Sequence, residues 1–374
     1  MAYTTIDDPS AHFQTGLYVG TGSELVITND GNSNLQPDLM WIKNRTDGST
    51  NHHWHDTTRG TTVTLFGNKT DAEETQAQSV KSVQSDGFTL GTWDGNNIDN
   101  KNFVAWQWKA NGGTTTSVSA SGTGEASINA STHQANTTAG ISIITYTGRD
   151  DQISAGQETK LTHGLGVVPR MFICKRRDGA SNWYVLGNNA TETSGFYWSY
   201  NEHLLLNQTA SVNGVNNTGN KAPDSTYIYL GNVLVNTVDS WIGYAFAEKQ
   251  GFSKFDKYVG NGNASGPFVY TGFKPAFVMV KIIDTNSGLA GEWQIYDHKR
   301  PGYNFPNYNL SPNNDTAEYT GSSYHNMDLL SNGFKILLTD VAVNTSGKIY
   351  GYAAFAENPF VTSDDGGSIP TTAR

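Results

Sequence analysis

The chain repeats one pattern of residues three times, and this repetition constrains the fold more than any other feature. Each copy has a Tyr-x-Gly step, then a proline followed by one variable residue, four apolar residues and a lysine, and later a second apolar block rich in aromatic residues. The proline blocks are Pro37–Lys43, Pro169–Lys175 and Pro275–Lys281, and the later blocks are Phe103–Trp108, Trp241–Phe246 and Tyr350–Phe355. Anchors that recur in constant order indicate one structural unit used three times.

The residues of these blocks predict β-strands. Four apolar residues between a proline and a lysine are typical of a central strand with both faces covered. Asp86-Gly87 in the first copy and Asn332-Gly333 in the third are dipeptides that close hairpins. Only 16% of the residues are charged, and 40 are glycine, so the polar surface comes from Asn, Thr, Ser and Gly, which favour turns and strands.

A repeat of about 110 residues also has the size of a two-sheet sandwich. We therefore expect an all-β protein with three tandem β-sandwich domains of jelly-roll or lectin-like type, formed by residues 1–110, 141–249 and 250–360. One polar stretch, residues 70–84, is helix-like, and we expect one or two helical turns within a loop there.

Two segments lie outside the repeats. Residues 111–140 contain Thr, Ser, Ala and Gly with almost no large apolar side chain, which indicates a flexible linker. The alternative is an arm that becomes ordered against a neighbouring subunit. Residues 361–374 are expected to form a mobile or partner-bound C-terminal tail.

Charge and cysteine content exclude several classes of protein. The formal net charge is -10, whereas a surface that follows phosphates would be basic, so we expect no nucleic-acid binding. The single cysteine, Cys174, rules out an internal disulfide or a zinc site with several thiolates, and its apolar surroundings place it in the core. We see no signal peptide and no apolar run that could span a bilayer, so we expect folding in a cytoplasm and no membrane insertion.

The densest group of chemically capable side chains is Asn51–Asp56, which contains three histidines. On a strand, His53 and His55 would share a face and could bind a metal ion. The third copy keeps only an Asp and an Arg three residues apart, Asp297 and Arg300, which correspond to Asp56 and Arg59. Because the histidines are not repeated, this pattern favours a structural ion pair or turn clamp over a metal site.

Other candidate sites are weaker. Asp94–Asn100 offers oxygen ligands for calcium but lacks the spacing and final Glu of an EF-hand loop, so a turn is the simpler interpretation. The acidic pairs of the chain are neighbours in polar loops, whereas glycosidase carboxylates face each other across a substrate. The motifs of serine hydrolases, nucleotide-binding loops and dinucleotide-binding folds are missing from the sequence. We therefore expect no catalytic residue, no bound cofactor and no metal.

The tryptophans divide into two groups. Trp41, Trp106 and Trp241 belong to the repeated blocks and are predicted to lie in the core. Three others lie in variable, loop-rich stretches, where an exposed ring could stack on a sugar. These candidate glycan-binding residues are Trp93, Trp183 and Trp198.

Several longer motifs resemble one known family. They include Asp8–Thr15, Trp41–Arg45 with His53–Gly60, Trp106–Ala110, Gly251–Phe255, Gly266–Phe273 and Ala354–Phe360. Taken together they resemble repeat-containing structural or tail-fibre-like proteins of the particles of marine tailed bacteriophages, over nearly the whole chain and most weakly at residues 111–140. The resemblance implies a virion component with lectin-like β-sandwich domains and no known chemistry.

These observations give one leading expectation and two alternatives. We expect a non-enzymatic virion protein, made in the cytoplasm of the bacterial host, that acts as a tail fibre, receptor-binding or particle-surface component. Its expected partners are other tail or capsid proteins, further copies of the same chain in a homo-oligomer such as a trimer, and a host surface glycan. The alternatives are a capsid decoration protein of cement or head-fibre type and a glycan-degrading tail enzyme.

Overall fold

A computed structural model describes residues 4–119, 128, 130–149, 159–187, 202–210, 213–214, 221–235, 238–283, 291–300, 304, 308–321 and 327–362. These residues form antiparallel sheets, so the all-β prediction is confirmed. Helical structure in this part of the chain is limited to α1 (Asp94–Asn97) and the 3-10 turns η1 (Pro9–Ala11) and η2 (Asn232–Leu234). No helix within the described ranges has the length and apolar character needed to cross a membrane.

Residues 13–108 form two sheets. The larger has the order β1-β9-β3-β4-β5-β6 and the smaller β2-β8-β7. Their strands are β1 (Phe13–Val19), β2 (Leu25–Ile27), β3 (Leu39–Asn44), β4 (His52–Asp56), β5 (Val63–Phe66), β6 (Glu74–Thr75), β7 (Val80–Gln84), β8 (Gly87–Leu90) and β9 (Asn102–Trp108).

Residues 116–246 form a second pair of sheets, with the orders β10-β11-β12-β19-β14-β15-β16-β17 and β13-β18. Their strands are β10 (Thr116–Ser119), β11 (Ala130–Asn136), β12 (Ile141–Thr147), β13 (Thr159–Thr162), β14 (Met171–Arg176), β15 (Trp183–Gly187), β16 (Glu202–Leu205), β17 (Asn213–Gly214), β18 (Tyr227–Leu230) and β19 (Ser240–Phe246).

Residues 253–359 form a third pair, with the orders β20-β26-β22-β23 and β21-β25-β24. Their strands are β20 (Ser253–Val259), β21 (Phe268–Tyr270), β22 (Phe273–Ile282), β23 (Gln294–Asp297), β24 (Met327–Leu330), β25 (Gly333–Ile336) and β26 (Ile349–Pro359).

One arrangement of four strands recurs in the three larger sheets. The orders β1-β9-β3-β4, β12-β19-β14-β15 and β20-β26-β22-β23 join strands that occupy the same place in each repeat. The register agrees as well, because Trp108, Phe246 and Phe355 each pair with the first strand and the apolar block of their own repeat. Residues can therefore be matched between repeats position by position, and we call residues 1–110, 141–249 and 250–360 the first, second and third copies.

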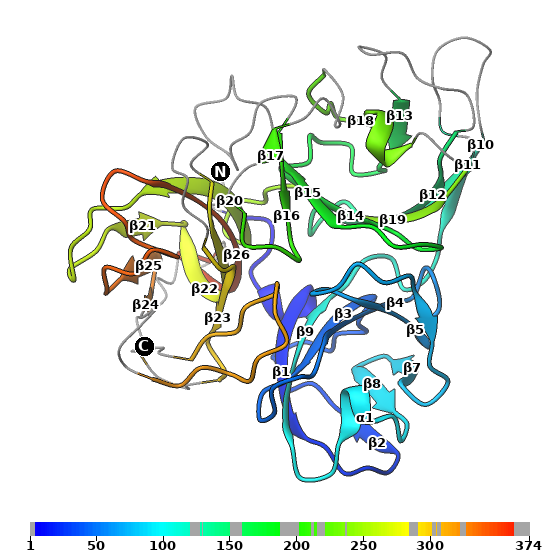
Figure 1. Cartoon of the computed structure of the whole chain (residues 1–374), viewed down its shortest axis with the longest axis horizontal. Helices are drawn as coiled ribbons and strands as arrows, with labels where there is room; N and C mark the ends of the chain where they lie inside the picture. Colours follow the sequence, from blue (N-terminus) through cyan, green and yellow to red (C-terminus); the bar gives the residue numbers. More distant parts are fainter. Residues whose placement is uncertain are drawn as a thin grey trace.

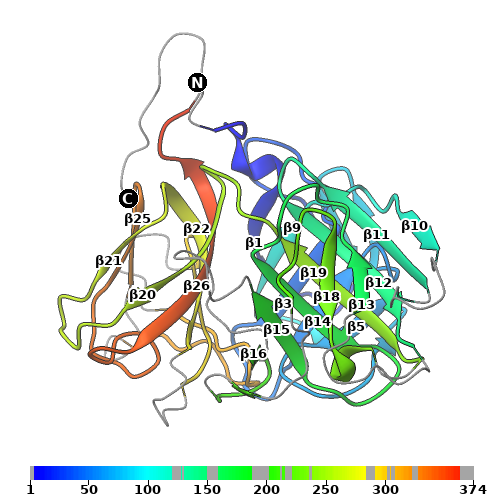
Figure 2. The same ribbon diagram turned by 90° about the horizontal axis from the view of Figure 1, so that it is seen from above.

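The three groups of strands lie around a common centre (Figures 1 and 2). Trp108, Phe246 and Phe355, which hold the same position in their copies, meet there. The centroids of Trp108 and Phe246 are 6.3 Å apart, those of Trp108 and Phe355 5.5 Å, and those of Phe246 and Phe355 5.8 Å. The strand register that the copies share thus places one aromatic ring from each copy at the centre, where all three rings are buried.

Two expectations about local structure are wrong. Residues 70–84 contain strands β6 and β7 in place of a helix, because the alternating residues of β7 pair with the hairpin partner β8. The described parts of residues 111–140 include β10 and β11, which extend the second copy's sheet. A flexible linker is therefore the wrong interpretation for these two strands, whose Thr and Ser side chains suit a strand with one solvated face.

Candidate functional site

The repeated Asp and Arg form a buried ion pair at the end of β4. Asp56 accepts hydrogen bonds from the backbone nitrogen of Arg59 at 2.8 Å and from its Nε at 2.6 Å. Arg59 Nη2 also donates to the carbonyl oxygen of Trp54 at 3.1 Å. Neither charged side chain has any exposed surface. The prediction of a structural ion pair is confirmed.

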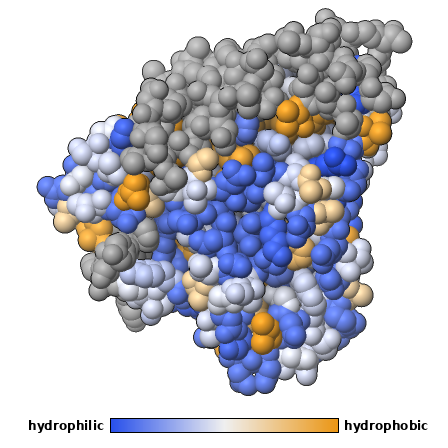
Figure 3. Space-filling view, in the orientation of Figure 1, coloured by the Kyte–Doolittle hydropathy of each residue, from blue (hydrophilic) through white to orange (hydrophobic). Residues whose placement is uncertain are grey.

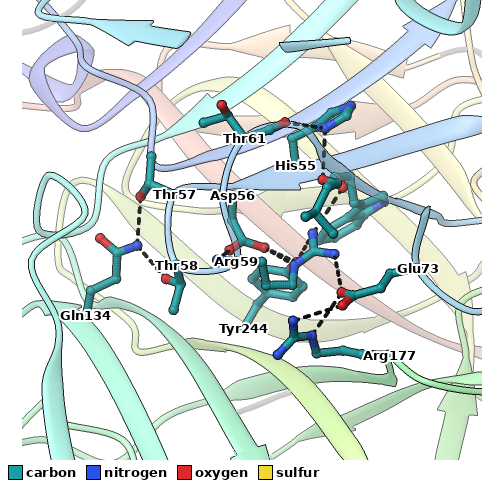
Figure 4. Close-up of polar contacts among 12 residues, drawn as sticks. His55, Asp56, Thr57, Thr58, Arg59, Thr61, Glu73, Gln134, Arg177 and Tyr244 are labelled. Carbon is teal, nitrogen blue, oxygen red and sulfur yellow. Dashed lines mark hydrogen bonds and ion pairs between the residues drawn. The ribbon is translucent and has the colours of Figure 1, made fainter. Parts of the chain in front are cut away.

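The pair continues into the second copy (Figure 4). The hydroxyl of Tyr244 on β19 donates to Asp56 Oδ2 at 2.9 Å. Glu73 lies between two arginines, 3.3 Å from Arg59 Nη1 and 2.8 Å from Arg177 Nη2, and its backbone nitrogen donates to the carbonyl oxygen of Arg177. These contacts join the first copy to the second. We call the five residues that make them the clamp: Asp56, Arg59, Glu73, Arg177 and Tyr244.

Charge and burial act against each other within the clamp. Burial alone would lower the pKa of Arg59, but the interactions with Asp56, Tyr244 and Glu73 together outweigh burial and raise it. Burial raises the pKa of Tyr244 well above its usual range, so its hydroxyl stays protonated and remains a donor. The arrangement therefore holds a fixed cation, a fixed anion and a neutral phenol away from water.

The same arrangement joins the third copy to the first. Asp297 accepts from Arg300 Nε at 2.6 Å and from its backbone nitrogen at 2.9 Å, and it also accepts from Trp106 Nε1 at 2.9 Å. Glu318 lies 3.0 Å from Arg300 Nη1 and 2.8 Å from Arg45 Nη2. Every member of the first clamp thus has a counterpart in this second clamp.

The positions of the donors follow from the repeat. Trp106 and Tyr244 each lie two residues before the central ring of their copy, and Arg45 and Arg177 each lie two residues after the repeated lysine. At the contact of the second and third copies the corresponding residues are Gly187, Ala353 and Ile283. That contact therefore has neither the acid nor the two donors of the clamp.

A different hydrogen bond occurs at the contacts involving the second copy. Trp183 Nε1 donates to the carbonyl oxygen of Phe66 at 2.8 Å, and Trp293 Nε1 donates to that of Leu205 at 2.9 Å. Phe66 and Leu205 are matched positions, since they pair with His53 and Tyr184 on neighbouring strands. In the described part of the chain, the second and third copies are thus joined by an indole hydrogen bond, and their contact has no clamp.

The three histidines of β4 are parts of the core. Trp41 Nε1 donates to His52 Nδ1 at 2.9 Å, the ring of His53 packs edge-on against Trp93, and His55 Nδ1 lies 2.9 Å from the carbonyl oxygen of Thr61. Burial lowers the pKa of all three, that of His55 to about 4, so they are neutral. Within the described ranges, no group of three or more His, Cys, Asp or Glu side chains could hold a metal ion.

The six tryptophans assigned to the core or to glycan binding from the sequence differ in their burial. Trp41, Trp106 and Trp241 are buried, which confirms their assignment to the core. Cys174 is buried as well, so its assignment to the core is also confirmed. Trp183 is also fully buried, so its ring cannot stack on a sugar, and the expectation of an exposed ring is wrong there. Trp93 is half-buried against His53, and Trp198 lies outside the described residues.

The glutamates and outer arginines of the clamps and three buried lysines were not predicted from the sequence. Lys43, Lys175 and Lys281 end the apolar blocks, have no exposed surface and have pKa values lowered by burial to about 8, 8 and 7. A signal for the arginines was present, since Lys43 and Lys175 are each followed two residues later by Arg. Glu73 and Glu318 could not be matched by sequence, because the loops that carry them differ in length and composition.

The fold and the two clamps define an all-β protein whose repeated antiparallel sheets are joined by buried ion pairs. Residues 8–359 match the family described as "Domain of unknown function (DUF7483)", and the chain belongs to this family. No curated protein matches the chain. No solved structure matches it either.

Proposed function

We propose that each repeat is a β-sandwich domain and that the three domains form one rigid body. Two facts support this assignment. Each copy pairs a larger sheet with a smaller one, and the strand order of the larger sheet recurs. In the first copy, Ile27, Phe88 and Phe103 form an apolar cluster of the kind that fills the space between two packed sheets.

We propose that the protein is a non-enzymatic structural component of a bacteriophage particle, namely a tail fibre, receptor-binding or particle-surface protein. The observation that carries this proposal is that the charged residues repeated between copies are buried in ion pairs. Asp56, Arg59, Asp297 and Arg300 form ion pairs whose side chains have no exposed surface, as expected of groups that join the copies to one another. The resemblance to phage structural proteins supplies the kind of particle.

The surface supports the same proposal. The described part of the face in Figure 3 is mostly hydrophilic, with small and scattered hydrophobic areas. Loops that join strands at such a surface can vary without affecting the core, as is common in proteins that present loops to a partner. Since the three copies already surround one centre, a homo-oligomer such as a trimer would use surfaces outside the contacts between copies.

Immunoelectron microscopy of intact phage tests this function. An antibody raised against the recombinant chain would be applied to purified particles of a phage that encodes it. We expect label on the tail or at a receptor-binding tip. Label spread over the head would favour the capsid decoration alternative, which the compact body also suits, and unlabelled particles would contradict a structural role.

A second measurement separates the structural role from a glycan-degrading enzyme. Purified protein would be incubated with host surface polysaccharide, and the products would be separated by size. We expect no release of oligosaccharide. Release that a single Asp or Glu substitution abolishes would overturn the non-enzymatic assignment.

A further inference from the structure

Among the described strands, β1 of the first copy has no neighbour along the edge at which its counterpart in the second copy has one. In the second copy, β12 is covered along its outer edge by β11, which pairs with it over seven residues. β1 holds the matching position, since Phe13 pairs with Trp108 as Ile141 pairs with Phe246. Within the part of the chain that the structure describes, β1 is an edge strand.

The backbone of β1 is arranged for a further strand. Just before β1, the carbonyl oxygen of His12 accepts a hydrogen bond from the backbone nitrogen of Lys109, and just after β1 the backbone nitrogen of Gly20 donates to the carbonyl oxygen of Lys101. The even-numbered residues of this segment therefore direct their backbone groups to the side of β9. Because antiparallel strands alternate the direction of their backbone groups, the odd-numbered residues of β1 direct theirs to the outer edge. Two of these residues, Leu17 and Val19, are 40% and 53% exposed. Unpaired backbone groups beside exposed apolar side chains are typical of an edge to which an extended segment can be added.

In the second copy, the added strand β11 also reaches the neighbouring copy. Gln134, which lies opposite Ile143, donates from Nε2 to the hydroxyls of Thr57 and Thr58 in the first copy. Its Oε1 accepts from the backbone nitrogens of Asn111 at 3.3 Å and Gly113 at 3.0 Å. One amide side chain thus fills the contact between these two copies.

The matching place at the contact of the third and first copies is a cleft of about 240 Å³. Its lining includes Thr15, His298, Lys299 and Asn358. Thr15 corresponds to Ile143, and His298 and Lys299 follow the clamp acid as Thr57 and Thr58 do. Asn358 lies three residues after the central ring, as Asn111 does. The cleft therefore lies where an amide on a strand added to β1 would be placed.

We propose that the outer edge of β1 and this cleft bind an extended segment of a partner protein. The segment pairs antiparallel with β1 and places a Gln or Asn side chain opposite Thr15. An uncharged polar side chain fits because the lining carries both signs of charge, with Lys299 bonded to Asp30 at 2.7 Å and Glu357 also at the cleft. β1 lies beside the third copy in both views (Figures 1 and 2), so one segment can contact both copies. The proposal does not depend on the function proposed above.

A synthetic peptide with the sequence of residues 128–136 is a suitable probe, because it contains the strand that covers the matching edge. Fluorescence anisotropy with the full chain would measure its binding, and hydrogen exchange would locate it. We expect saturable binding and slower exchange in residues 13–19. A peptide in which the residue corresponding to Gln134 is alanine should bind at least about tenfold more weakly, since it loses several hydrogen bonds.

Two matched pairs of changes test the site. Leu17→Pro removes an outward donor of β1 without touching its bonds to β9, and it should abolish binding, whereas Val259→Pro on the outer edge of β20 should leave binding unchanged. On the peptide, methylation of the backbone nitrogen at the position of Thr132 should abolish binding, and methylation at the position of His133, which faces away, should not. The peptide pair remains informative if Leu17→Pro fails to fold.

Several results would overturn the proposal. One is the absence of saturable binding at millimolar peptide. A second is unchanged affinity in both tests, that of Leu17→Pro with the unmodified peptide and that of the native chain with the Thr132-methylated peptide. A third is slower hydrogen exchange in a strand other than β1. A protein dimer that Leu17→Pro converts to monomer would assign the edge to a second copy of the chain. A tenfold gain in peptide affinity on removal of residues 363–374 would assign it to the chain's own tail.

Discussion

The hydroxyl of Tyr244 donates a hydrogen bond of 2.9 Å to the carboxylate of Asp56, a residue 188 positions earlier in the chain. Trp106 makes the matching bond to Asp297, also at 2.9 Å, from the same position of another copy. An indole and a phenol thus serve the same purpose, because each carries one donor at the end of a flat apolar ring. The two contacts that contain a clamp therefore share a buried donor at this position, which either ring can supply.

Removing the donor tests how much this bond stabilises the protein. We expect Tyr244→Phe to lower the free energy of unfolding by about 1.5–3 kcal/mol, since the acceptor is a buried carboxylate. Urea denaturation followed by fluorescence measures the change. Tyr18→Phe, which removes a bond of 2.8 Å to the carbonyl oxygen of Asn96 within the first copy, is the control and should cost about 1 kcal/mol. An equal or larger loss in the control would contradict the special role of the contact between copies.

Removing the acid should have a larger effect. We expect Asp56→Asn to lower the free energy of unfolding by about 3–5 kcal/mol, because the enclosed guanidinium of Arg59 loses the carboxylate at 2.6 Å and keeps only the partly exposed Glu73 at 3.3 Å. Glu24→Gln breaks the exposed ion pair with Lys81 and should change stability by less than about 1 kcal/mol. The double variant Asp56→Asn with Tyr244→Phe should lose less than the sum of the two single losses. Strict additivity would show that the two side chains act independently.

The repeats could be found in the sequence because the positions that define them lie on central strands. Those strands keep the length and register of their apolar blocks, and the hairpins at Gly87 and Gly333 recur for a steric reason. A Cβ at Gly87 would lie 2.0 Å from the carbonyl oxygen of Ile27, and one at Gly333 would lie 2.1 Å from that of Val269. Glycine is therefore required at both turns, and the strands around them could be predicted.

The contacts between copies could not be predicted in the same way. A repeat indicates which residues are equivalent but not which copy lies against which. The Asp and Arg pairs were recognised as structural, whereas Trp106 and Tyr244 look like ordinary core residues until the copies are placed together. Trp183 was misjudged for this reason, since it lies in a variable stretch of its own copy and is buried by the first.

The contact between the second and third copies should open before the other two. It has Gly187, Ala353 and Ile283 in place of the acid and donors of the clamps. Strand β15 ends at Gly187 at this contact, whereas β4 and β23 end in the clamp acids Asp56 and Asp297. We expect the amides of β15 to exchange with deuterium at least about tenfold faster than those of β4 and β23 under native conditions. Hydrogen exchange with mass spectrometry of peptides from the full chain measures this.

Two other exchange patterns would contradict this prediction. Slowest exchange in β15 would show that apolar packing holds the second and third copies together more firmly than the ion pairs hold the others. Equal exchange in all three strands would indicate that the body opens as one cooperative unit. Either result would contradict a weak third contact.

Stability should rise with pH above neutrality because of the buried lysines. Burial lowers the pKa of Lys281 in the folded protein to about 7, whereas the ordinary value of 10.5 applies to the unfolded chain. Between these values the unfolded chain binds more protons than the folded one, so the free energy of unfolding increases with pH. Lys43 and Lys175, with pKa values lowered to about 8, act in the same direction. The increase should be measurable from pH 7 to about 9.5, below the range in which tyrosines of the unfolded chain ionise.

Lys281→Met isolates the contribution of one lysine. Its Nζ donates to the carbonyl oxygens of Thr209 and Gly291, so the variant loses these bonds but also removes a buried ammonium group. We expect the slope of the free energy of unfolding against pH to become shallower in urea titrations between pH 7 and 9.5, whatever the change in stability at pH 7. Lys81→Met, at an exposed position of β7, should leave the slope unaltered. If Lys281→Met and the native chain share one slope, the ammonium of Lys281 keeps its charge in the folded state, and the hydrogen bonds to Thr209 and Gly291 offset its burial.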